Sequence, residues 1–213
     1  MSRSVTLRLR RAVCPISIAF RLSHILRSTV PQVTAKRFVA LLRGINVGGR
    51  NKVAMADLRT AFEDGGHEDV RTYIQSGNVL FESASKRSSL EDGIERFLED
   101  RFGVPLVVVV RSRDQLRTVI GRAPDGFGAK THHCDVIFLK SPLTARKALQ
   151  VVRLREDVDQ VWPGTGVLYF ARRSAALTKS RMSAIVGTPE YKLMTIRSWA
   201  TTTKLLTLID EKA

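Results

Sequence analysis

The residues best suited to chemistry lie in a glycine-rich loop, Gly44–Lys52, which reads Gly-Ile-Asn-Val-Gly-Gly-Arg-Asn-Lys. The apolar stretch Phe38–Leu42 runs into this loop, and a helical pattern follows it. Glycines let backbone N–H groups converge, and the N-terminus of a helix favours anions. Because Arg43, Arg50 and Lys52 add positive charge, the loop predicts a site for a phosphate or a carboxylate. A turn with a purely structural role is the alternative.

The spacing of these glycines differs from that of two known phosphate-binding loops. Neither Gly-x-x-x-x-Gly-Lys-Ser/Thr nor Gly-x-Gly-x-x-Gly is matched. The candidate ligand-binding residues here are Arg43, Asn46, Gly48, Gly49, Asn51 and Lys52.

A second polar group, Gln75, Ser76 and Asn78, lies between two strand-like stretches. Serine, glycine and asparagine suit a tight turn, and contact with a polar ligand is the alternative.

Other chemistries find little support in the residue types. Neighbouring residues of a strand point to opposite faces, so His132 and His133 are not expected to share a metal ion, and we expect no metal site. No Gly-x-Ser-x-Gly elbow occurs. Asp57 and Glu82 are the nearest acids to the polar groups, which disfavours two-metal phosphoryl transfer and hydrolysis by a carboxylate pair. The sequence designates no catalytic residue and no cofactor, and whether the protein is an enzyme stays open.

The formal net charge is +15, from 35 basic and 20 acidic residues. Such a charge favours anionic partners, either a small molecule or a nucleic acid, although the stretch Asn78–Glu82 lacks the aromatic and basic pattern of an RNA-binding strand. No apolar run approaches the roughly 18 residues of a membrane span. The two cysteines, Cys14 and Cys134, cannot form a disulfide framework, so we expect a cytoplasmic protein. The oligomeric state stays open.

Residues 1–36 carry seven of the basic residues and no acid. This composition is typical of an organellar transit peptide. The alternative is that the segment lies upstream of a true start codon at Val33. In either case we expect an unpacked, disordered extension, because the segment lacks a sustained apolar period.

The remaining sequence predicts an α+β fold of two tandem ferredoxin-like (βαββαβ) modules packed as one body, followed by a C-terminal helix. The expected divisions are 37–111 for the first module, 112–132 for a connector helix and loop, and 133–213 for the second. The two modules share the order of their elements and not their residues. Five successive apolar residues, Leu106–Val110, form a nominal edge strand of the first module, so we expect both faces of that strand to be covered. Ser112 with Gln115 predicts a capping box, and Ser198 predicts the cap of the terminal helix.

The block Arg37–Phe81 resembles a bacterial family of unknown role, domain of unknown function 1697. Two later stretches are also similar to that family. They are Lys179–Met182, where the family has a Gly-Arg-Ser-Lys-Leu-like helix start, and Ile196–Leu205, where Ser198 and Ala200 replace its usual asparagines.

The resemblance implies further ligand-binding candidates in the second half: Lys179, Ser180, Arg181, Arg197, Thr203 and Lys204. These positions are basic or polar, with few acids among them. We therefore expect one anion site shared between the Gly44–Lys52 loop and basic residues of the second half.

Overall fold

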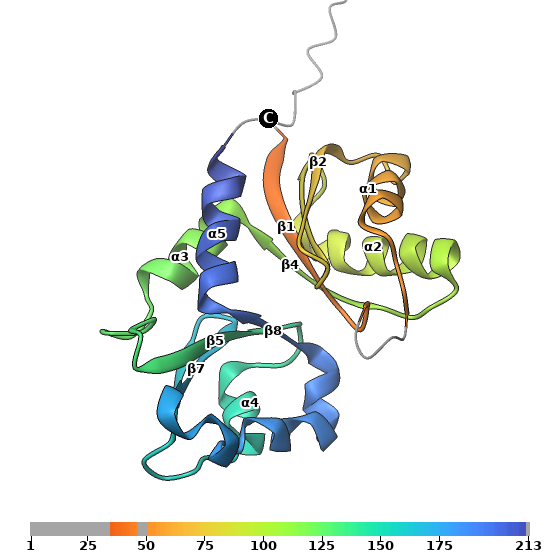
Figure 1. Cartoon of the computed structure of the whole chain (residues 1–213). Coiled ribbons are helices and arrows are strands. Elements are labelled where there is room, and N and C mark those ends of the chain that lie inside the picture. Colours follow the sequence, from red (N-terminus) through yellow and green to blue (C-terminus); the bar gives the residue numbers. More distant parts are fainter. Residues whose placement is uncertain (1–34, 47–50, 212–213) are drawn as a thin grey trace, which may run out of the picture. The chain divides into compact units, whose positions relative to one another are not determined.

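The computed structural model describes residues 35–46 and 51–211 (Figure 1). The expected N-terminal extension lies outside the described residues except for its last two positions, and Lys36 already begins a strand. Both sheets described below belong to the same compact unit.

The first sheet contains four antiparallel strands in the order β2-β3-β1-β4. Its elements in chain order are β1 (Lys36–Arg43), α1 (Met55–Asp64), β2 (Glu68–Tyr73), β3 (Asn78–Ser83), α2 (Arg87–Phe102) and β4 (Val107–Ser112). Helix α3 (Arg113–Gly121) follows β4 directly, and the expected capping box between Ser112 and Gln115 is confirmed. The predicted stretches Phe38–Leu42 and Leu106–Val110 agree with β1 and β4 to within about two residues at each end.

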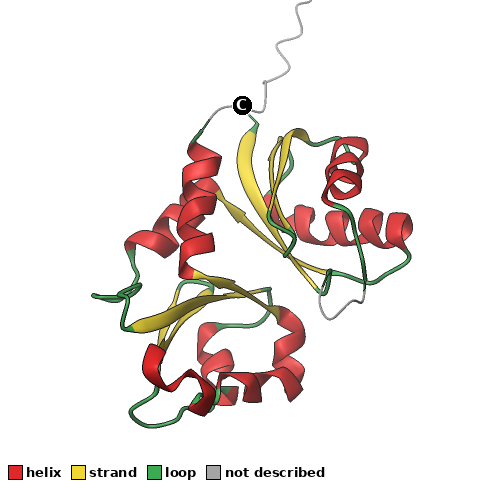
Figure 2. Ribbon diagram, in the orientation of Figure 1, coloured by secondary structure: helices red, strands yellow, loops and turns green. Residues whose placement is uncertain are grey.

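The second sheet repeats the same order, β6-β7-β5-β8, again with antiparallel pairing. Its elements are β5 (His132–Leu139), α4 (Ala145–Val151), β6 (Asp159–Gly164), β7 (Val167–Arg173), three 3-10 segments η1 (Ser174–Lys179), η2 (Met182–Gly187) and η3 (Pro189–Leu193), β8 (Met194–Ser198) and the C-terminal helix α5 (Trp199–Asp210). Within the described part of the chain, the fold is therefore α+β with two four-stranded antiparallel sheets and a C-terminal helix (Figure 2).

Three apolar clusters arrange these elements in layers. One face of the first sheet packs on α1 and α2, and one face of the second sheet packs on α4 and the 3-10 segments. The opposite faces of both sheets share a middle cluster with α3 and α5. Alternation along each strand produces this pattern: in β4, Val108 and Val110 face α1 and α2, whereas Val109 faces the middle cluster. The expected burial of both faces of β4 is confirmed at these residues.

Strand β4 lies at an edge of its sheet, and side chains of α2 and α3 occupy its free edge. The outward N–H of Val108 donates to Glu95 at 2.8 Å, and that of Val110 donates to Glu91 at 2.9 Å. The N–H of Ser112 donates to the side chain of Gln115 at 3.0 Å. Three successive edge donors are thus satisfied without a neighbouring strand.

Two predicted helix details in the second half are wrong. Ser141-Pro142 is typical of an N-cap followed by a first-turn proline and predicts a helix from this point. Helix α4 instead begins at Ala145 with Thr144 as its cap, because the Thr144 hydroxyl accepts the N–H of Lys147. The sequence also predicts a helix over 179–186, following the family's helix start, and the structure has 3-10 segments there. In η2 the buried residues are Met182 and Ile185, three positions apart, which is the 3-10 period.

Candidate functional site

The loop between β1 and α1 is closed by its two asparagines. Asn46 donates from Nδ2 to the carbonyls of Val53 at 2.9 Å and Gln75 at 3.1 Å, and its Oδ1 accepts the N–H of Val53 at 2.9 Å. Asn51 donates to the Gly44 carbonyl at 2.8 Å. Both asparagines have positive φ angles, 54° and 49°, which this residue type tolerates better than most. Their side chains therefore fix the described ends of this connection, at Gly44 and at Val53.

A cavity of about 560 Å³ lies where this loop meets α1. It is lined by Asn46, Lys52, Val53, Ala54, Met55, Asp57 and Gln75. Ala54 occupies the N-cap of α1, and among the described residues no side chain caps this helix end. The first N–H groups of α1 consequently lack a capping acceptor beside a cavity that carries an exposed lysine.

The other predicted loop residues fall into three groups. Gly48 and Gly49 lie outside the described residues. Arg43 stacks its guanidinium 4.1 Å from the centroid of the Tyr191 ring, in η3 of the second half. Gln75 and Ser76 are exposed, whereas Asn78 is completely buried and donates from Nδ2 to the Tyr73 carbonyl at 2.9 Å.

Arg197 extends from β8 of the second sheet into the first. Its Nε donates to Asn78 Oδ1 at 2.5 Å, and its Nη2 lies within hydrogen-bond distance of the carbonyls of Leu42 at 2.7 Å, Ser76 at 2.9 Å and Gly77 at 3.1 Å. Nη1 donates within β8, to the Thr195 hydroxyl and the Ile196 carbonyl. Every nitrogen of the guanidinium thus has a protein acceptor. These contacts support a positioning role for Arg197, fixing the turn that carries Gln75 and Ser76.

Arg111 of β4 makes the reciprocal connection from the first sheet to the second. Its Nη2 donates to the carbonyls of Leu139 at 2.6 Å and Gly166 at 3.0 Å. The two arginines have matching surroundings: Leu42 N donates to Gly77 O, and Leu139 N donates to Gly166 O. Burial lowers the pKa of each guanidinium to about 10, so both remain cationic at neutral pH.

The glycines of these two turns match as well. Gly77 has φ +76° and Gly166 has φ +70°, in the left-handed region that favours glycine. A Cβ at Gly166 would lie 3.3 Å from Arg111 Nη2, and one at Gly77 would lie 2.9 Å from the Leu42 Cβ. A side chain at Gly166 would crowd the Arg111 guanidinium, and one at Gly77 would crowd Leu42, whose carbonyl accepts from Arg197. Both turns therefore need glycine next to the arginine that reaches them.

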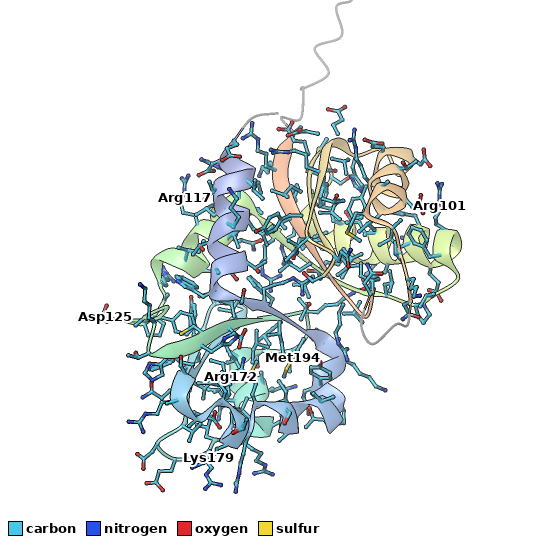
Figure 3. All side chains as sticks on the ribbon, in the orientation of Figure 1. Arg101, Arg117, Asp125, Arg172, Lys179 and Met194 are labelled. Atoms are coloured by element: carbon cyan, nitrogen blue, oxygen red, sulfur yellow. The ribbon has the colours of Figure 1, made fainter. Side chains whose placement is uncertain are left out.

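The remaining predicted residues are not brought to the β1–α1 loop. Arg181 donates its backbone N–H to Asp159 in β6, which is three strands from β8 and Arg197, or about 14 Å at the usual strand spacing. Lys179 lies at the bottom of Figure 3, on the far side of the second sheet from β1. The Ser180 hydroxyl accepts the N–H of Met182, so this group fixes its own turn.

The two candidates in α5 also have local partners or face solvent. The Thr203 hydroxyl donates to backbone carbonyls of its own helix, Trp199 and Ala200, and Lys204 is exposed. The structure therefore gathers Asn46, Lys52, Gln75 and Ser76 near one cavity and leaves the second-half candidates, except Arg197, away from it.

The described residues form neither a metal-binding cluster nor a membrane-spanning helix. No group of three or more His, Cys, Asp or Glu residues in residues 35–46 and 51–211 is arranged to hold a metal ion. Nor does any helix in these ranges have the length and apolar character needed to cross a bilayer.

Sequence reasoning missed Arg111, and it gave Arg197 as a ligand-binding candidate and not as a link between the two sheets. A signal was present: β4 ends in Val110-Arg111-Ser112 and β8 ends in Ile196-Arg197-Ser198. In both, the serine caps the helix that follows, as predicted for Ser112 and Ser198. The repeated Arg-Ser pair therefore marks equivalent ends of the two halves.

The protein is α+β, with two sheets of the same strand order, and an arginine from each sheet donates to a main-chain carbonyl of the other. The chain belongs to the family described as "Protein of unknown function (DUF1697)", whose profile matches residues 35–169. It is similar to a solved structure, that of the conserved bacterial protein SP0830 from Streptococcus pneumoniae. The two share 25% sequence identity with a TM-score of 0.75, over 83% of this chain and 99% of that one. No curated protein matches the chain.

Proposed function

We propose that this protein binds a small molecule bearing a phosphate or carboxylate group in the cavity at the N-terminus of α1. The observation that carries the proposal is the uncapped first turn of α1, open to a cavity with Lys52 on its lining. Free N–H groups and the helix dipole both favour an anion at this position. The volume of about 560 Å³ suits a metabolite-sized ligand.

The other lining groups suggest what else the ligand carries. Asp57 brings a carboxylate to the same cavity, and a carboxylate accepts hydrogen bonds from hydroxyl groups. Gln75 is exposed there and offers both a donor and an acceptor. The proposed ligand therefore combines one anionic group with neutral polar groups, and Arg197 positions the turn that presents Gln75.

The proposed frame for this site is a pair of ferredoxin-like modules, 37–111 and 133–213, joined by a connector over 112–132. The matching strand orders β2-β3-β1-β4 and β6-β7-β5-β8 support it. We place the binding in the cytoplasm, a location that suits the free thiol of the buried Cys134.

A change at the helix cap tests the proposal. Ala54→Asp supplies the missing acceptor and should stabilise the unliganded protein by about 1 kcal/mol. The same change should abolish stabilisation by inorganic pyrophosphate, because the new carboxylate occupies the N–H groups and repels the anion. In the wild type, pyrophosphate at ~100 times its Kd should add about 2.7 kcal/mol in a thermal-shift titration.

Matched charge changes make the test specific. Lys52→Gln should reduce the pyrophosphate shift, whereas Lys130→Gln, at an exposed position between α3 and β5, should leave it intact. An equal shift in Ala54→Asp and wild type would contradict the proposal. So would a wild-type shift given by a 12-nucleotide single strand and not by pyrophosphate, an outcome that favours nucleic-acid binding.

A further inference from the structure

A second cavity, of about 480 Å³, lies at the position in the second half that matches the first cavity. The first borders the connection from β1 to α1, beside the β2–β3 turn; the second borders the connection from β5 to α4, beside the β6–β7 turn. Thr144 occupies the N-cap of α4 as Ala54 occupies that of α1, but only the Thr144 side chain accepts an N–H of its helix. Because Thr144 caps α4, the first turn of this helix offers no free N–H group to an anion. The kind of ligand that suits this cavity must therefore be inferred from its other lining residues.

Arg111 provides the charge of the second cavity. The residue lines it and is only 5% exposed. Its Nη1 and Nη2 donate to main-chain carbonyls, and within the described residues no acceptor is bonded to its Nε. Arg111 therefore retains one donor without an acceptor in the described chain, and the residue lines a cavity of ligand size.

The carboxylate nearest to Arg111 is shared with a second arginine. Glu91 lies 3.6 Å from Arg111 Nη1 and 3.6 Å from Arg87 Nη1, and Arg87 also lines the cavity. Two guanidinium groups thus face one buried carboxylate, so the positive charges exceed the negative by one. Arg111 and Glu91 are buried, whereas the side chain of Arg87 is 39% exposed and lies at the rim of the cavity. Asp114 lines the cavity as well but is exposed, so water and salt screen its charge.

The rest of the lining is partly apolar and partly hydroxyl-bearing. Val119, Leu139 and Leu143 are buried apolar residues, and Thr118, Thr144 and Thr165 bring hydroxyl groups. An apolar wall next to an unneutralised arginine suits a molecule with a charged end and an apolar body. Phosphate-rich ligands fit less well, because a single excess charge cannot balance several negative ones.

We propose that this cavity is a second ligand site, which takes a small organic monocarboxylate. The carboxylate lies against Arg111 and Arg87, and the apolar body lies against Leu139, Leu143 and Val119. Since Arg111 also donates to Leu139 and Gly166, a ligand on this arginine contacts the link between the two sheets.

Hexanoate and hexan-1-ol are matched probes for isothermal titration calorimetry, because they share the apolar chain and differ in the charge. We expect saturable hexanoate binding in the millimolar range and about tenfold weaker binding of hexan-1-ol. Thr118→Phe fills the cavity from an exposed position on α3 and should weaken hexanoate at least about tenfold. Arg87→Gln should weaken it about three- to tenfold, and the control Arg96→Gln, elsewhere on α2, should not.

The results separate this site from the α1 cavity. Ala54→Asp should leave hexanoate affinity unchanged, whatever it does to pyrophosphate. Absence of saturable hexanoate binding to the wild type up to about 10 mM would overturn the proposal. Equal binding of the alcohol and the acid, or undiminished binding to a folded Thr118→Phe variant, would overturn it too.

Discussion

Replacing Arg197 with methionine tests whether the arginine from β8 holds the two sheets together. The change removes hydrogen bonds to Asn78 Oδ1 and to the carbonyls of Leu42, Ser76 and Gly77. Gly77 O keeps the N–H of Leu42, and Ser76 is exposed to water, so the main losses are at Asn78 and Leu42.

Each buried acceptor left without this donor costs about 1–3 kcal/mol. Methionine returns some apolar packing and removes the cost of burying a charge, because burial lowers the pKa of Arg197 and no charged group of the described chain offsets it. The expected net loss is therefore about 2–4 kcal/mol of unfolding free energy, a large share of the ~5–15 kcal/mol typical of a domain.

Urea unfolding followed by far-UV circular dichroism measures this loss. With a slope of roughly 2–3 kcal/mol per molar, the midpoint should fall by about 1 M or more at an unchanged slope. The control is Arg96→Met, which replaces an exposed arginine on α2 that donates to one backbone carbonyl and should cost less than about 0.5 kcal/mol. A loss below about 1 kcal/mol for Arg197→Met, or one equal to that of Arg96→Met, would refute the reasoning.

Two further predictions concern the shared core and the pH dependence of stability. Val108→Asp places an unpaired charge in a completely buried position, so it should destabilise both sheets by several kcal/mol in one transition. The two tryptophans, Trp162 and Trp199, belong to second-half elements and pack on the middle cluster. A fluorescence transition retained in that variant after the first sheet has unfolded would contradict a shared unfolding unit. Burial lowers the pKa of His67, so the unfolded state binds the proton more readily and stability should fall as pH drops below about 6.5. His67→Leu should lose this part of the pH dependence, and an unchanged difference in stability between pH 7.5 and pH 5.5 would count against it.

The sequence was sufficient to predict most of the elements because their signals are local. The apolar stripe of α2, the glycine that ends it and the Ser112–Gln115 box all depend on residues close in the chain. The burial of Val108–Val110 on two faces also follows from composition alone, since a strand solvated on one face would alternate.

The candidate site was harder to predict because its key contacts join distant residues. Arg197 and Asn78 are 119 positions apart, and Arg111 and Gly166 are 55 apart, so spacing says nothing about either pair. The basic residues at 179–181 looked similar to Arg197 in sequence, yet Asp159 fixes the backbone of Arg181 on the opposite edge of the sheet. Charge and residue type alone could not separate an arginine that links two sheets from one that faces solvent.

The carboxylates of Glu91 and Glu95 along β4 have a consequence for how copies of this chain can associate. An exposed edge strand recruits further strands because its N–H and C=O groups are free to pair. On β4 the outward N–H groups of Val108 and Val110 are already bonded to these glutamates. Lys140 of the second half donates to Glu95 at 2.5 Å and so helps to hold this carboxylate at the edge of β4. A neighbouring chain would have to displace carboxylates supplied by α2 before its first backbone hydrogen bond could form. This apolar strand is therefore protected from strand addition and fibril-like growth without any charged residue at Val107–Val110.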